Sequence, residues 1–523
     1  MKKLMSILLV LLMLTSVLAS CGGNDETTTT EAPTTEAPTT EAPTTEAPTT
    51  EAPTTEAPTT EAPTTEAPST KDPNVIWSSK DDARDTWNGK TLNIACSTWY
   101  SKEAPWTMPE VFITEENDAK FGKKIQNAVL DRNEFIENSY GVKVNWINAT
   151  NSNMHEALEA ATLAKNINYD LAAPRMMNAQ SIVAGGYVYD LANREFIDFR
   201  NSYYNEDSVN TYTAHGHTFF VTGGFSPLDK ESSFILFFNK NLLGNGSQKA
   251  TDDLYDLVRD GKWTYDKFVA YAEAAYKDDG DGIKNDTDTF GALIGTGLDR
   301  YYDYFGIYQA GVNEATGQWE ITFKNDRDKI DDIADVIKET VDYDWFLGSA
   351  AGGWGVTNEL FTENTFLFYS ETLDHTWLGN SADIGVVPFP MLNKEQGRYY
   401  VPCSMETSVA MCIPKITQDR EMSEYFMDVL CWTGEEYTMK AYLEIKKEQF
   451  KDDAGIEMIT EYIIPNISYD VGSAVGWSRL LPKVRTASWS DNKDFDEVYA
   501  EIEPDALKTI AEWNAAWGGY TEE

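Results

Sequence analysis

Residues 27–68 repeat the pentapeptide Glu-Ala-Pro-Thr-Thr, with a proline at every fifth position and no large apolar side chain. Such a segment cannot bury enough apolar surface to offset its chain entropy, and its prolines favour the extended polyproline II conformation. At about 3.1 Å per residue its contour length approaches about 130 Å. A packed core must therefore come from the residues after the repeat, and we interpret residues 21–70 as a spacer. The abundant threonines leave a glycosylated, mucin-like stalk open as a second interpretation.

The chain begins with the pattern of an export signal. Two lysines precede an uncharged apolar run at residues 4–18, which is too short to span a bilayer as a permanent helix. The run ends in Leu-Ala-Ser-Cys at 18–21. This ending resembles the lipobox of bacterial lipoproteins, which implies that residues 1–20 are a signal peptide and that Cys21 carries a diacylglycerol and palmitate-type anchor. We therefore expect attachment to membrane lipid through Cys21, on the outer face of the cell membrane. An ordinary signal peptide cut near an unmodified cysteine is the alternative.

Charge and length restrict the partners of the remaining chain. The formal net charge is −43 over 523 residues, and an excess of this size repels phosphate backbones. Nucleic acid is therefore not an expected partner, and we interpret the acidity as a device for solubility. Residues 71–523 are too many for one simple core and favour two lobes. After the lipobox no segment approaches the length of a membrane span. We expect a monomer.

Four cysteines lie beyond Cys21. They are Cys96, Cys403, Cys412 and Cys431. They form no C-x-x-C pair and the chain has only four histidines, so a His/Cys metal cage has little material. We interpret these cysteines as small buried apolar side chains rather than disulfides, although their redox state is not fixed by the sequence.

Short apolar runs alternate with amphipathic segments along the body. Strands are predicted at 92–96, 142–146 and 169–173, with helical segments between them and Gly141 as a helix stop. Strands that alternate with helices pair in parallel through crossovers, so the pattern indicates an α/β fold. Further strands are predicted at 217–222, 233–239, 366–369, 383–387 and 409–413, and further helices after Thr264, from Met422 and around 506–517.

Six short motifs follow one another in a recognisable order. They are Phe-Ile-Glu-Asn-Ser-Tyr-Gly-Val-Lys-Val at 135–144, Tyr-Asp-Leu at 169–171, Phe-Phe-Asn-Lys-Asn-Leu-Leu at 237–243, Leu-Tyr-Asp-Leu-Val-Arg-Asp-Gly-Lys-Trp-Thr at 254–264, Asp-Ile-Gly-Val-Val-Pro-Phe-Pro at 383–390 and Ile-Pro-Lys at 413–415. Their order over residues 91–477 resembles that of bacterial extracellular solute-binding proteins, family 1 type, which serve carbohydrate ABC importers.

This resemblance implies a two-lobed, periplasmic-binding-protein-like α/β fold with hinge strands between the lobes. A ligand, here an oligosaccharide, would sit in the cleft, and closure would present the lobes to the permease subunits of an ABC transporter. We place the first lobe at 71–228 plus 379–416 and the second at 229–378 plus 417–523. The resemblance implies carbohydrate transport by sugar binding, without covalent chemistry or an obligatory cofactor.

A site for neutral sugars needs aromatic platforms and polar groups, on loops that leave the carboxyl ends of strands. The candidates at such positions are Trp99, Tyr100, Arg175, Asn178, Glu231, Glu371, Trp377, Glu406 and Trp477. We favour Trp99, Glu231, Glu371, Glu406 and Trp477. Core packing is the alternative for each aromatic side chain, and a solvated surface charge is the alternative for each acid.

The acidic segment 278–288 resembles the calcium loops often found at this point of the same family. A calcium loop needs oxygen ligands at alternating positions and a glycine at the sixth. With Gly282 as the sixth residue, the ligand positions fall on Asp279, Asp281 and Asp288. The first position then falls on Lys277, which cannot ligate a cation, although Asp278 could replace it. Calcium (Ca2+) and a plain polar turn both stay open.

Two other classes of protein deserve comparison. A lipid-anchored glycoside hydrolase would use two carboxylates about 5–9 Å apart, but 85 acidic residues guarantee such pairs in any fold. The G-x-S-x-G, H-E-x-x-H and G-x-x-x-x-G-K-[ST] motifs do not occur. We therefore do not expect an enzyme. A surface adhesin that holds polysaccharide with its aromatic side chains is the remaining alternative.

Overall fold

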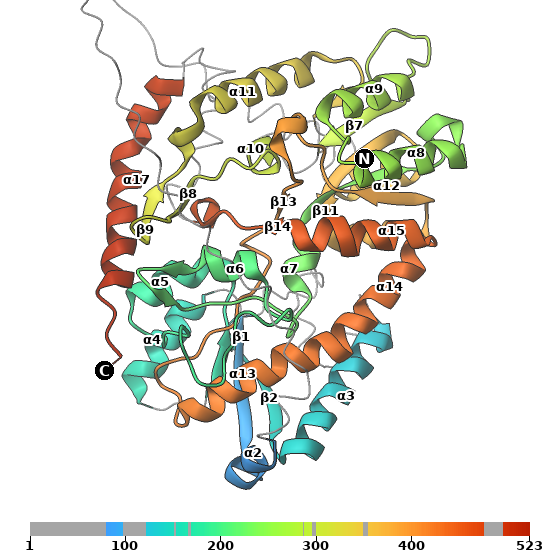
Figure 1. Ribbon diagram of the computed structural model, residues 1–523. Helices are drawn as coiled ribbons and strands as arrows, with labels where there is room; N and C mark the ends of the chain where they lie inside the picture. Colours follow the sequence, from blue (N-terminus) through green and yellow to red (C-terminus); the bar gives the residue numbers. More distant parts are fainter. Residues whose placement is uncertain are drawn as a thin grey trace, which may run out of the picture. The chain divides into compact units, whose positions relative to one another are not determined.

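The computed structural model describes most of the body of the chain (Figure 1). The described residues are 80–97, 122–150, 153–165, 169–285, 287–294, 300–348, 354–474 and 495–522. All of them belong to the unit Ala67–Glu523. The signal, Cys21 and the spacer lie outside the described residues. Among the residues described, no helix combines the length and the apolarity that crossing a bilayer requires.

The first sheet is built from three parallel strands. β1 (Thr91–Ser97) lies between β2 (Lys143–Thr150) and β3 (Leu171–Ala173). Helices α3 (Gly122–Tyr140) and α4 (Met154–Ala164) follow β1 and β2 in sequence. All three strands and the parallel pairing were predicted from the alternation of apolar runs with helical segments, and the structure confirms them.

The segment at 409–413 lies beside the first sheet, to which the chain returns after the second sheet. It was predicted to be a strand, but it forms isolated antiparallel bridges instead. Cys412 pairs with Ala172, whereas the preceding residue, Met411, pairs with Val221. Because neighbouring residues pair with different segments, no continuous ladder forms.

The second sheet has five strands. Their order is β10 (Phe346–Leu347), β7 (Phe290–Ile294), β11 (Phe366–Thr372), β6 (Phe234–Asn239) and β12 (Ile384–Val387). Strands β7, β10 and β11 run parallel, and β6 is antiparallel to both of its neighbours. Every residue of β6, β7 and β12 is buried, as expected for strands that read as continuous apolar runs.

Two elements lie with the sheet opposite to the one we expected. Strand β12 was placed in the first lobe, yet it pairs with β6. Helix α13 (Arg420–Gly434) was placed in the second lobe, yet its Phe426 packs on Trp87 and Tyr140 near β1, with ring centroids 5.8 and 5.6 Å apart. Sequence order could not reveal these placements, because the chain passes between the sheets again after β12. The other lobe boundaries stay a prediction.

A long helical run extends from the elements packed near the first sheet to those packed near the second sheet. Helix α13 continues without a break into a π-helical turn, η9 (Glu435–Met439), and then into α14 (Lys440–Phe450), drawn in orange in Figure 1. At the junction Gly434 lies against Gly224 so closely that a Cβ on Gly434 would overlap the Gly224 carbonyl oxygen. Helix α14 contacts both α3 and the turn η7 (Leu373–Asn380).

The remaining elements surround the two sheets. The helices are α2 (Lys80–Trp87), α5 (Ala179–Ala184), α6 (Glu206–Thr211), α7 (Leu228–Glu231), α8 (Gln248–Arg259), α9 (Tyr265–Ala275), α10 (Arg300–Tyr304), α11 (Arg327–Asp342), α12 (Trp354–Thr362), α15 (Asp453–Glu457) and α17 (Phe495–Gly518). The short strands are β4 (Thr213–Ala214), β5 (His217–Thr218), β8 (Ala310–Asn313), β9 (Gln318–Ile321), β13 (Val401–Pro402) and β14 (Ile467–Ser468). Thr264 is the N-cap residue of α9, although its side chain makes no capping hydrogen bond.

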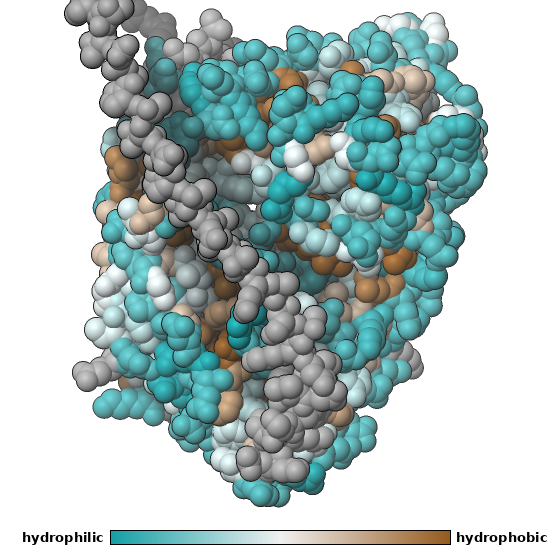
Figure 2. Space-filling model, in the orientation of Figure 1, coloured by the Kyte–Doolittle hydropathy of each residue, from teal (hydrophilic) through white to brown (hydrophobic). Residues whose placement is uncertain are grey.

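The surface and the cysteines agree with the sequence analysis. Figure 2 shows a face dominated by hydrophilic residues. Within the described part of the chain, the large exposed apolar side chains are Leu130, Leu163, Ile283 and Leu507. The cysteines outside the signal region are buried and free, as expected for small apolar side chains.

Candidate ligand-binding site

The structure describes five of the nine predicted ligand-binding residues in full. Trp99, Tyr100 and Trp477 lie outside the described residues, as does the side chain of Trp377. The five others are Arg175, Asn178, Glu231, Glu371 and Glu406.

Three of these five meet at the carboxyl end of β3. Arg175 is the second residue after the strand, and Asn178 ends the short 3-10 helix η4 (Met176–Asn178). The Arg175 Nε donates a hydrogen bond of 2.5 Å to the backbone carbonyl oxygen of Glu406. Burial lowers the pKa of Arg175, while the nearby charge of Glu406 opposes that shift. The buried guanidinium of Arg175 and the exposed carboxylate of Glu406 therefore lie at the carboxyl end of a strand, which is where ligands bind in open α/β sheets.

Glu371 lies at the carboxyl end of β11 in the second sheet. Its buried carboxylate accepts hydrogen bonds from the Thr372 backbone N–H at 2.9 Å and from the Tyr369 hydroxyl at 3.4 Å. Burial raises the pKa of Glu371. In the following turn, η7, His375 Nδ1 lies 2.6 Å from Asp374 Oδ1. Several titratable groups therefore converge at this end of the sheet.

Arg300 joins the same edge and was missed by the sequence analysis. It opens α10, which follows β7. Its guanidinium carbon lies 3.7 Å from the centroid of the Phe234 ring, at the start of β6, and its Nη1 lies 3.7 Å from Asp303. The carboxyl-end rule would have found Arg300 if the strand at Phe290–Ile294 had been predicted.

Glu231 ends α7, the short helix that leads the chain into β6 and that we call the crossover helix. Glu231 is buried, with 2 % of its surface exposed. Its Oε1 lies 2.5 Å from the Nζ of Lys446, a residue of α14 that the sequence analysis also missed. A signal for Lys446 existed, because it stands at four-residue spacing between Tyr442 and Phe450, on the buried side of the helix. The Oε2 of Glu231 has no hydrogen-bond partner within the described part of the chain.

A single turn at 404–408 connects the candidate residues at the strand ends of the first sheet to those of the second sheet. The Ser404 N–H donates to the Ser232 carbonyl next to Glu231, at 2.8 Å. At its other end, the Ser408 carbonyl accepts from the Met176 N–H beside Arg175, at 3.0 Å. The segment η12 (Val471–Ala474), which precedes Trp477 in sequence, contacts η4. The Leu373 N–H, two residues after Glu371, donates to the Ser233 carbonyl at 2.9 Å. Hydrogen bonds therefore join the segments that carry the described candidates.

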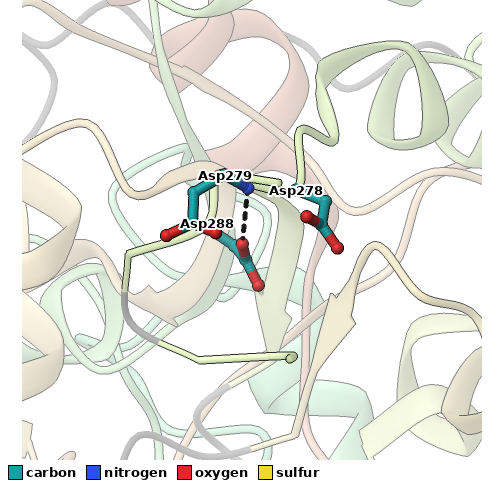
Figure 3. Close-up of side chains that lie close together, drawn as sticks. All are labelled: Asp278, Asp279 and Asp288. Atoms are coloured by element: carbon teal, nitrogen blue, oxygen red, sulfur yellow. Dashed lines mark hydrogen bonds between the residues drawn. The ribbon is translucent and has the colours of Figure 1, made fainter. Parts of the chain in front are cut away.

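The acidic loop at 278–288 is closed by a bridge between Lys277 and Thr289. This pairing places Asp278 and Asp279 beside Asp288, with carboxylate oxygens within 4.8 Å of one another, and Asp281 is not part of the group (Figure 3). The Asp279 N–H donates to Asp288 Oδ1 at 3.0 Å. Asp288 is 2 % exposed, whereas Asp278 and Asp279 are exposed. An oxygen-only donor set of this kind suits calcium.

Comparisons with known proteins support the fold. No family profile matches the chain, and no curated protein matches it. Among solved structures, the cyclo/maltodextrin-binding protein complexed with maltotetraose superposes with a TM-score of 0.51 at 13% identity, covering 81% of this chain and 96% of that one.

Two further structures match at similar coverage. The GacH receptor of Streptomyces glaucescens, solved unliganded and with acarbose, has a TM-score of 0.49 at 13% identity, over 81% of this chain and 99% of that one. An ABC substrate-binding protein from Listeria monocytogenes in complex with cycloalternan has a TM-score of 0.48 at 12% identity, over 81% of this chain and 100% of that one. The chain has the α/β fold of the cyclo/maltodextrin-binding protein, as its motifs predicted.

Proposed function

We propose that this protein is a lipid-anchored extracellular receptor that captures an oligosaccharide between two lobes and delivers it to the permease subunits of an ABC importer. The observation that carries the proposal is the path through the turn at 404–408. It joins the edge with Arg175 and Glu406 to the edge with Glu371, in a chain with the fold of a protein solved with maltotetraose.

The chemistry of the two edges suits a neutral sugar. The hydroxyl groups of a sugar form hydrogen bonds with carboxylates and guanidinium groups. The apolar faces of the sugar ring stack on aromatic rings. The described residues at the carboxyl ends of the strands supply Arg175, Arg300 and Glu371 for the first task. We assign stacking to Trp99, Tyr100, Trp377 and Trp477, and hydroxyl binding to Asn178. Binding rather than bond cleavage accounts for these groups.

The N-terminal segments fit the same function. A diacylglycerol on Cys21 would hold the protein at the outer face of the membrane, and the spacer would let the body reach both solute and permease. Lobe closure would favour the bound state by its differential affinity for the sugar. We expect the body to act as a monomer without nucleic-acid partners.

A thermal-shift screen of the mature chain carrying Cys21→Ser, against a panel of soluble oligosaccharides, tests the proposal. A receptor is stabilised by one group of related sugars and releases them unaltered. Shortened sugars in the same samples would instead indicate a hydrolase. Pull-down on insoluble polysaccharide, without a shift for any soluble sugar, would indicate an adhesin.

We further propose that Asp278, Asp279 and Asp288 hold a calcium ion that secures their loop. The proximity of the three carboxylates and the burial of Asp288 support this assignment. When bound, the ion would neutralise mutually repelling charges and would take no part in sugar binding.

A further inference from the structure

We propose that Lys446 is a positioning residue for sugar binding. It is a buried cation that does not touch the ligand but fixes the position of the crossover helix α7 relative to the turn η7. This inference rests on the proposed function and deepens it. It concerns the helix that ends at Glu231 and the turn after Glu371, which carries Trp377.

The contacts of Lys446 reach two elements besides its own helix. From α14, its Nζ lies 2.5 Å from Glu231 Oε1 in α7. The same Nζ donates to Thr376 Oγ1 at 2.8 Å and to the Leu373 carbonyl oxygen at 3.4 Å, both in η7. It also lies 4.8 Å from the centroid of the Tyr442 ring. One side chain thus joins α14 to the end of the crossover helix and to the turn that follows Glu371.

The burial of this side chain argues for a role beyond stability. Lys446 is 1 % exposed and Glu231 is 2 % exposed. Removing such charges from water costs so much that apolar residues of similar volume commonly replace a buried ion pair without loss of stability. Three directional contacts from one ammonium group instead constrain the relative geometry of three segments, and this is the role that we assign to Lys446.

The position of α14 explains how the contacts of Lys446 can affect sugar binding. The helix is continuous with α13, which packs near β1 on Trp87 and Tyr140. Lys446 therefore connects a helical run that packs near the first sheet to the carboxyl end of β11 in the second sheet, where the candidate ligand-binding residues lie. When that connection is lost, η7 and the end of α7 can shift relative to the edge that carries Arg175 and Glu406.

The first variant is the double substitution Glu231→Met and Lys446→Met, measured in the Cys21→Ser chain with the sugar that stabilises the parent most. The single variant K446M should be strongly destabilised, because it leaves a buried carboxylate unpaired. The double variant should regain the unfolding midpoint of the parent. Its dissociation constant for the sugar should nevertheless rise by about tenfold or more, comparable to the loss of one well-placed hydrogen bond.

Two further variants complete the test. Thr376→Val removes the hydrogen bond from Lys446 and a second one to Gln449, but it keeps the ion pair. It should weaken sugar binding and lower the unfolding midpoint by far less than K446M does. Arg194→Met with Glu424→Met removes two members of a different charge cluster, which also contains Arg420 and Glu522, and should leave the affinity unchanged. If T376V binds the sugar like the parent, the inference is overturned while the proposed function stands, because a loss of affinity in E231M/K446M alone would also follow from a direct contact between Glu231 and the sugar. If the parent binds no sugar, the proposed function fails first.

Discussion

Replacing Trp517 with alanine should destabilise the protein more than any single change at its surface. Trp517 lies near the end of α17 and is 0 % exposed. Its ring meets Phe219 edge-on at 5.4 Å and Trp319 edge-on at 5.6 Å, so it joins α17 to the segment after β5 and to strand β9. Truncating a buried tryptophan costs about 3–5 kcal/mol, including about 0.5–1.5 kcal/mol for each lost edge-to-face pair.

The same helix supplies a matched control. Leu507 is 50 % exposed, so Leu507→Ala should change the free energy of unfolding by less than about 0.5 kcal/mol. Both variants are compared with the parent by urea unfolding, followed by far-UV circular dichroism, using the displacement of the midpoint. A midpoint for W517A no lower than that for L507A would refute the burial argument for α17.

Three further predictions concern other parts of the structure. Because burial raises the pKa of Glu371, its contribution to stability is fully present below the ordinary carboxylate pKa and is lost as the pH rises through the raised folded value. Unfolding of Glu371→Gln should lack this decline, and identical pH profiles for variant and parent would contradict the assignment. Addition of Ca2+ should raise the melting temperature of the parent but not of Asp288→Asn, and an equal rise in both would remove the loop as the calcium site. Gly434→Ala should lower the melting temperature despite the better helix propensity of alanine, because its Cβ meets the Gly224 carbonyl, and a higher melting temperature would show that the contact relaxes freely.

Local features of the fold were predictable from the sequence. The strands at 92–96 and 142–146 are short apolar runs bounded by polar or glycine-containing turns, and the structure extends them by only a few residues as β1 and β2. The helix predicted around 506–517 forms the second half of α17. Such elements are specified by contacts between residues close in sequence, so a periodic pattern is sufficient evidence for them.

Features that depend on distant partners were not predictable. The apolar run of β12 does not indicate that it pairs with β6, about 150 positions earlier in the chain. The spacing of Tyr442, Lys446 and Phe450 indicates a lysine on a buried helix face, yet nothing in the pattern names Glu231 as its partner. The carboxyl-end rule predicted Arg175 and Glu371, while Arg300 was missed together with the strand that precedes it.

The central claim is that this protein binds an oligosaccharide reversibly and leaves it intact. The most direct measurement is isothermal titration of the Cys21→Ser chain with the sugars that stabilise it, followed by mass spectrometry of the recovered sugar. The account predicts one sugar per chain, a micromolar dissociation constant and an unchanged sugar mass. Recovery of shortened sugars, or the absence of saturable binding across the whole panel, would contradict it.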